Sequence, residues 1–72
     1  MDRNKLISAH NLLVTIIKEE RARLRGRPKA LAQYNQKISE TVKNIANMKY
    51  AIEACNISLA MDYLDKAKKG ML

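Results

Sequence analysis

The side chains that could take part in catalysis are few and lie far apart along the chain. His10 is the only imidazole and Cys55 the only thiol among the 72 residues. No motif places a nucleophile beside His10, as a catalytic pair would require. His10 falls near the apolar face of a predicted helix, so we expect a half-buried structural histidine there. The sequence therefore predicts a protein that is not an enzyme.

The acidic residues also lack a catalytic arrangement. Asp62 and Asp65 share a helix face, but Lys66, Lys68 and Lys69 follow within a few residues, as is usual for charges on a solvated helix surface. One histidine and one cysteine do not complete a structural zinc site. No glycine-rich loop that could cradle a phosphate is present. We expect neither a metal nor a cofactor.

Positive charge is the most pronounced feature of the composition. The chain has 14 Lys and Arg against 7 Asp and Glu, and the excess gathers in residues 18–29 and near the carboxyl end. Such a cluster can contact nucleic-acid phosphates or steer an acidic protein partner. The tyrosines are not interleaved with it, so no stacking platform for single strands is apparent. The candidate nucleic-acid contacts are Arg23, Arg25, Arg27 and Lys29.

One tetrapeptide in this cluster has two interpretations. Arg25-Gly26-Arg27-Pro28 resembles an AT-hook, whose extended arginines enter the narrow minor groove of A·T-rich DNA. The same residues suit a turn between helices, with Gly26 in the left-handed conformation after one helix and Pro28 in the first position of the next. We expect the turn at 25–28 and keep the hook as the alternative.

The apolar periodicity predicts helices on both sides of this turn. Residues 4–24 form an amphipathic pattern. Residues 28–55 carry apolar side chains at alternating steps of three and four, a heptad seam in which Cys55 is expected to be a small core residue. The seam consists of Leu31, Tyr34, Ile38, Thr41, Ile45, Met48, Ile52 and Cys55. Because the turn is short, we expect the two helices to be antiparallel.

After Cys55 the apolar stripe shifts to another phase. Asn56 and Ser58 are both plausible helix caps, so we expect a break and a third helix over about 58–69. A single long second helix is the alternative. The predicted fold is one all-α domain over 1–72, an antiparallel coiled-coil-like hairpin with a short third C-terminal helix or extension.

The lengths of these helices indicate that part of the seam needs a cover. The first helix is roughly 30 Å long, whereas a second helix running to residue 69 would be about 63 Å. Either the tail folds back over the excess or another chain covers it, since monomers seldom expose large apolar patches. A chain this small without a disulfide or metal is often stabilised by association. We expect self-association or a helical protein partner, bound through Tyr34, Ile38, Val42, Ile45, Met48, Ile52, Leu59 and Leu64.

The apolar run near the amino terminus does not predict membrane insertion. Ser8, His10, Asn11 and Thr15 interrupt residues 6–17, and charged residues follow where a signal-peptide cleavage site would lie. The run is also too short to span a bilayer. We expect a cytoplasmic protein with a reduced cysteine.

The order of the predicted elements resembles a known family. An amphipathic helix, a glycine-containing turn and Ala32-Gln33-Tyr34-Asn35-Gln36 at the start of a longer helix look like the small helical-hairpin co-chaperones of type III secretion needle subunits. The family places a Gln-Tyr pair early in its second helix, here Gln33-Tyr34. The resemblance implies a cytosolic adaptor that joins a larger helical-repeat chaperone and holds a needle subunit as a monomer. A nucleic-acid-binding protein and a phage or mobile-element modulator of a host protein are the alternatives.

Overall fold

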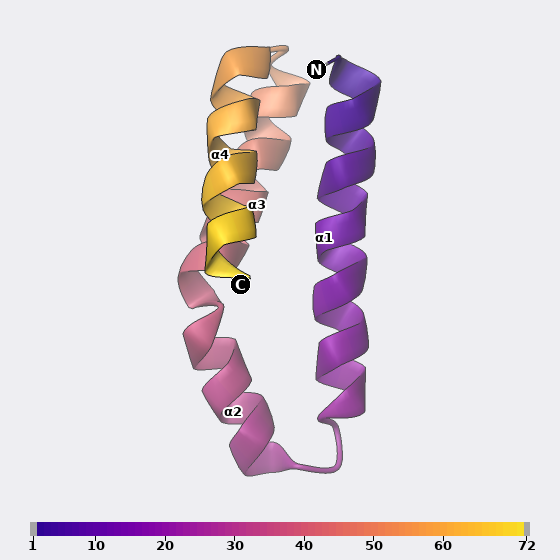
Figure 1. The fold of residues 1–72 in the computed structure, drawn as a ribbon, viewed down its shortest axis with the longest axis vertical. Coiled ribbons are helices and arrows are strands. Elements are labelled where there is room, and N and C mark those ends of the chain that lie inside the picture. The colour runs from indigo at the N-terminus through magenta and orange to yellow at the C-terminus, as the bar shows by residue number, and fades with distance from the viewer. Residues whose placement is uncertain (1, 72) are drawn as a thin grey trace.

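The computed structural model describes residues 2–71, which are helical apart from short connections and contain no strand. The four helices are α1 (Arg3–Arg23), α2 (Pro28–Lys37), α3 (Ser39–Glu53) and α4 (Ile57–Gly70) (Figure 1). The all-α prediction is therefore confirmed. The expected hairpin of residues 4–24 with 28–55, and its coiled-coil packing, are not.

α1 is amphipathic and is capped at its beginning. The Asp2 carboxylate accepts a hydrogen bond from the Lys5 backbone N–H at 2.8 Å, which satisfies one of the free amides of the first turn. Leu6, Leu13 and Ile17 recur on one face, and all three are buried against the rest of the chain. α1 packs on α3 and α4, so the core lies between these three helices.

The structure divides the predicted helix 28–55 at Ile38. Ile38 lies at φ −97° and ψ 6°, outside the regular helix, and the Ser39 hydroxyl donates to the Gln36 carbonyl at 3.1 Å. A serine hydroxyl that bonds back to the preceding turn competes with the backbone ladder and bends the helix. α2 therefore runs at an angle to α3 and diverges from α1 (Figure 1).

The closest pair of helices is α3 with α4. α4 folds back along α3 and packs on it more extensively than any other two helices of the described chain do (Figure 1). Ala51, Ala60 and Ala67 are buried, and their small side chains permit the close approach. Of the two ways to cover the long apolar stripe, the structure has the tail folding back over it.

The corner between α3 and α4 depends on Cys55, which was expected in the core but is exposed. Cys55 has φ 57°; its N–H donates to the Ile52 carbonyl at 3.0 Å, and the Asn56 N–H donates to the Ala51 carbonyl at 2.9 Å. This is the Schellman arrangement, in which a left-handed residue reverses the chain after a helix. Asn56 then caps α4 by accepting from the Leu59 N–H at 3.2 Å.

Gly26 does not take the left-handed conformation that the sequence suggested for it. Neither glycine of the described chain has a positive φ. The connection between α1 and α2 is closed by hydrogen bonds from the Arg25 N–H to the Ala22 carbonyl and from the Arg27 N–H to the Leu24 carbonyl, at 3.2 and 2.9 Å. These tight turns make the glycine's extra freedom unnecessary.

Replacement of Cys55 by glycine should stabilise the protein. A left-handed conformation costs a residue with a side chain about 1–2 kcal/mol, and glycine avoids this cost. Glycine has a larger conformational entropy in the unfolded state, which offsets roughly 0.5–1 kcal/mol of the resulting stabilisation. We expect Cys55→Gly to raise the free energy of unfolding by about 0.5–1 kcal/mol in urea denaturation. Cys55→Ala removes the thiol but keeps the strain, so an equal gain in that variant would contradict this account.

Replacement of Gly70 by alanine should have the opposite effect. A Cβ atom at Gly70 would lie 2.0 Å from Thr41 Oγ1 and 3.3 Å from Thr41 Cβ, and Thr41 is buried. We expect Gly70→Ala to cost about 1–3 kcal/mol of stability, as overpacking does. In a Thr41→Ala background the same change should cost less than half as much, because the colliding hydroxyl is gone. An equal loss in both backgrounds, or the gain of up to ~1 kcal/mol that helix propensity alone favours, would refute the steric explanation.

Candidate functional site

Most of the residues expected to bind a partner lie in the core of the chain itself. Five are buried, namely Ile38, Ile45, Met48, Ile52 and Leu64. Tyr34 is half-buried, whereas Val42 and Leu59 are exposed. Because α1 and α4 cover the heptad seam, that seam is not a free surface of the folded chain.

An uncovered region remains where α4 ends. α4 has 14 residues and is roughly 21 Å long, whereas the molecule measures 39 Å along its longest axis. Figure 1 shows α4 ending midway along the molecule, with α1 and α2 continuing beyond it. In that space is a hollow of about 290 Å³, which we call the α1–α2 hollow. It is lined by Ile16, Glu20, Tyr34, Lys37, Ile38, Gly70 and Met71.

Two apolar side chains of α1 are exposed on this flank. Ile16 lines the hollow and is 42% exposed, and Leu12, one helical turn earlier, is 61% exposed. Side chains four residues apart lie on the same face of a helix. Neither residue could be identified as a contact from the sequence. Ile16 is exposed because α4 ends beside it and α2 diverges from α1, whereas Leu12 does not line the hollow.

The polar groups of the hollow carry mixed charge. Burial, and after it the negative charge of Glu20, raises the pKa of the Tyr34 hydroxyl, so Tyr34 is a neutral hydrogen-bonding group at physiological pH. A hydrogen bond from Arg23 holds the pKa of the Glu20 carboxyl below its usual value. With Lys37 opposite, the hollow has an apolar floor and one charge of each sign at its rim. It suits an amphipathic segment better than a small ion.

The candidate nucleic-acid contacts gather around the connection between α1 and α2. Arg23, Arg25, Arg27 and Lys29 are all exposed, and Arg23 forms an ion pair with Glu20. Arg21 bridges the two helices, because its Nε donates to Asn35 Oδ1 at 2.9 Å. A second hollow of about 590 Å³, here the basic hollow, is lined by Lys18, Arg21, Ala22, Arg25, Leu31 and Asn35.

The AT-hook-like tetrapeptide is folded into the connection. Arg27 donates its N–H to the Leu24 carbonyl, and its own carbonyl accepts from the Leu31 N–H at 2.9 Å, at the start of α2. A hook reads the minor groove with an extended chain. Arg25 and Gly26 therefore belong to a turn that begins at Leu24, Arg27 joins that turn to α2, and Pro28 is the first residue of α2.

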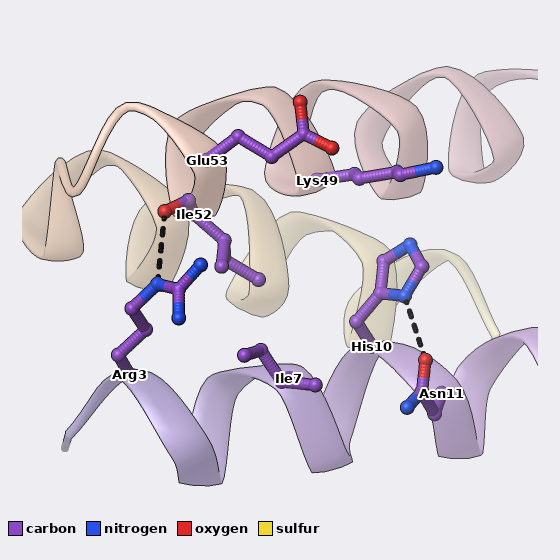
Figure 2. A pocket seen from close by; sticks show the side chains of 7 residues that line it. All are labelled: Arg3, Ile7, His10, Asn11, Lys49, Ile52 and Glu53. Carbon is purple, nitrogen blue, oxygen red and sulfur yellow. Dashed lines mark hydrogen bonds between the residues drawn. The ribbon is translucent and has the colours of Figure 1, made fainter.

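A third hollow, of about 280 Å³, contains His10 and lies between the beginning of α1 and the end of α3 (Figure 2). Figure 2 shows His10 hydrogen-bonded to its neighbour Asn11, at 3.3 Å between Nδ1 and Oδ1. Arg3 Nε donates to the Ile52 carbonyl at 3.5 Å and so links the two helix ends. The Arg3 contact joins α1 to α3, whereas the His10 contact stays within α1. His10 is half-buried.

The described residues offer no metal centre and no membrane-spanning helix. Over 2–71, no group of three or more His, Cys, Asp or Glu side chains is placed to hold a metal ion. Within the same range, no helix has both the length and the apolar character needed to cross a bilayer. Comparison with protein-family models, with curated proteins and with solved structures finds no match to this chain.

α2, which forms one wall of both the α1–α2 hollow and the basic hollow, should be the least stable helix. None of its residues is buried, whereas α3 has five buried residues. Segments with few buried contacts open at a lower free energy than the global unfolding of the protein. In native-state hydrogen exchange, we expect the amides of residues 32–37 to exchange at least about 100-fold faster than those of residues 45–52, a difference of roughly 2.7 kcal/mol. Equal protection of the two segments would show that α2 is part of the core.

Proposed function

We propose that this chain is a non-enzymatic protein–protein interaction module that holds an amphipathic helix of a partner protein in the α1–α2 hollow. The observation that carries the proposal is the open space beyond the end of α4. There α1 and α2 present apolar side chains with no third helix on them. A helical segment of a partner would occupy the position that α4 occupies along the rest of the core.

The length of the molecule beyond α4 sets an upper limit on the bound segment. That length is about 18 Å, since 39 Å less roughly 21 Å remains. A helix rises about 1.5 Å per residue, so the segment has at most about 12 residues. Their apolar face would contact Ile16, Tyr34 and Met71, which line the hollow. Amphipathic helices that lie in such grooves use apolar anchors three, four and seven residues apart.

The Tyr34 hydroxyl, Glu20 and Lys37 supply the polar part of this interface. Tyrosine combines a large apolar ring with a hydrogen-bonding tip and is favoured at protein interfaces. Glu20 is already paired with Arg23, whereas Lys37 has no ion-pair partner among the described residues, so Lys37 favours a partner helix with an acidic residue along its edge. Charges of this kind contribute mainly to the specificity and register of binding.

A small cytoplasmic adaptor or co-chaperone fits this mode of binding. Such a protein covers the apolar face of a partner helix that would otherwise aggregate, and this role requires no catalytic activity. The resemblance to the co-chaperones of type III secretion needle subunits places the Gln-Tyr pair at Gln33-Tyr34. Tyr34 lines the α1–α2 hollow, so in this proposal it contacts the partner.

Substitution of Ile16 tests the proposal, because Ile16 lines the α1–α2 hollow and is 42% exposed in the free chain. We expect Ile16→Asp to weaken partner binding at least about tenfold, that is by roughly 1.4 kcal/mol or more. The stability of the free protein should change by less than about 1 kcal/mol, because the side chain is largely in contact with solvent. Binding is measured to the partner that photo-crosslinks to benzoylphenylalanine at Lys37, which lines the same hollow, with the crosslinked segment identified by mass spectrometry.

Tyr50 supplies the matched control. It is 72% exposed on α3 and does not line the α1–α2 hollow. Tyr50→Asp introduces the same charge and should leave partner binding unchanged. Equal losses in the two variants, or a crosslinked segment without an apolar helix face, would contradict the proposal.

A further inference from the structure

The positive charge of the chain is confined almost entirely to one stretch. Residues 21–39 contain six of the 14 Lys and Arg and none of the seven Asp and Glu. The rest of the chain has eight basic residues against seven acidic ones, so this stretch accounts for six of the seven net positive charges. It comprises the end of α1, the connection and α2 (Figure 1). One end of an elongated molecule is therefore strongly positive and the remainder is nearly neutral.

The cations at this end have little internal compensation. Among the described residues the one ion pair is that of Arg23 with Glu20, which occupies the nearest well-placed carboxylate. Arg21 bonds the neutral amide oxygen of Asn35 instead of a carboxylate. Lys18, Arg21 and Arg25 surround a single hollow, so their charges lie close enough to act on one ligand.

We propose that the basic tip, defined as Lys18, Arg21, Arg25, Arg27 and Lys29, binds the phosphate backbone of duplex nucleic acid without reading its sequence. A closely spaced row of phosphates is the ligand that a cluster of uncompensated Lys and Arg favours, since binding releases condensed counterions. Arginine in addition matches the geometry of phosphate oxygens through two parallel donors. The Arg21–Asn35 hydrogen bond fixes one such arginine beside the basic hollow, between α1 and α2.

The surroundings of the basic tip favour duplex phosphates over other polyanions. Single strands are held by aromatic side chains on which bases stack, but Tyr34 lines the α1–α2 hollow and not the basic hollow. An acidic protein helix would need apolar surface to bury, and within the basic hollow Ala22 and Leu31 supply it. Lys18 and Arg21 also border an apolar hollow with Val14, Ile17, Val42 and Ile45, but Arg25, Arg27 and Lys29 do not. The AT-hook tetrapeptide is folded into a turn, so the proposal includes no preference for A·T-rich duplex.

This proposal is independent of the protein-binding function. The basic hollow and the α1–α2 hollow have no lining residue in common. A variant of one surface can therefore leave the other intact, and the two proposals can fail separately. Together they would make the chain a link between a helical protein and nucleic acid.

The test is fluorescence anisotropy of the full chain with a labelled 20-base-pair duplex DNA of mixed sequence at 50 and 200 mM NaCl. We take one phosphate contact for each of the three cations that line the basic hollow. The slope of log affinity against log salt is then roughly −2.7, so the Kd should rise about 40-fold between the two salt concentrations. Lys18→Gln with Arg25→Gln removes two of the contacts. We expect weaker binding at 50 mM and a slope smaller by about 2, which reduces the salt effect to roughly threefold.

The control is Lys43→Gln with Lys68→Gln, which lowers the net charge equally with exposed residues outside the tip. Its slope should remain that of the unmodified chain. Equal effects of the two double variants would overturn the proposal in favour of general charge attraction, and so would undetectable binding at 50 mM. A preference for A·T-rich duplex that Arg27→Ala abolishes would indicate the hook instead. Displacement by poly-glutamate as effective as that by unlabelled duplex would indicate an acidic protein ligand. Ile16→Asp, a variant of the α1–α2 hollow, should bind the duplex unchanged.

Discussion

The close packing of α4 on α3 is the contact on which the rest of the structure depends. Gly70 approaches the buried Thr41 so closely that even one added carbon atom would collide with its hydroxyl. Ala60 and Ala67 continue the same contact toward the corner at Cys55. Burial of an apolar side chain contributes roughly 1.5–3 kcal/mol, and Met48 and Leu64 gain this contribution only because the small residues let α4 approach. Without α4 the heptad seam of α3 would have one helix, α1, to cover it.

The length of α4 then decides which surface stays open. The corner at Ala54 to Asn56 fixes where α4 begins, and α4 ends at Gly70, about halfway back along the combined length of α2 and α3. Up to that point the core has three helices around it. Beyond that point Ile16 and Ile38 are left at the edge of the α1–α2 hollow. The candidate binding surface is thus a consequence of unequal helix lengths and not of a special motif.

The fold class could be predicted from the sequence because it depends on local properties. The periodicity and the sparse turn residues specify helices, and Asn56 and Pro28 lie at the starts of two of them. The break at Ile38 could not be predicted, because Ile38 belongs to a regular heptad pattern and the bend involves the back-bonding of the Ser39 hydroxyl. The exposure of Cys55 depends on the left-handed corner, which its residue type does not indicate. The candidate site was assigned to the seam because a one-dimensional pattern shows which residues are apolar but not which helix covers them.

The openness of the α1–α2 hollow and the charge of the basic tip have a common origin in α2. α2 has no buried residue and no acidic side chain, so it packs little on α1 and offers no carboxylates to pair with the arginines there. Its Lys29 would approach the cations at the end of α1 if the two helices closed. Like charges repel at short range even where salt screens them at longer distance. The one side-chain hydrogen bond between the two helices uses the neutral Asn35, which links them without neutralising Arg21. α2 therefore stays apart from α1, and this separation leaves one hollow apolar and the other basic.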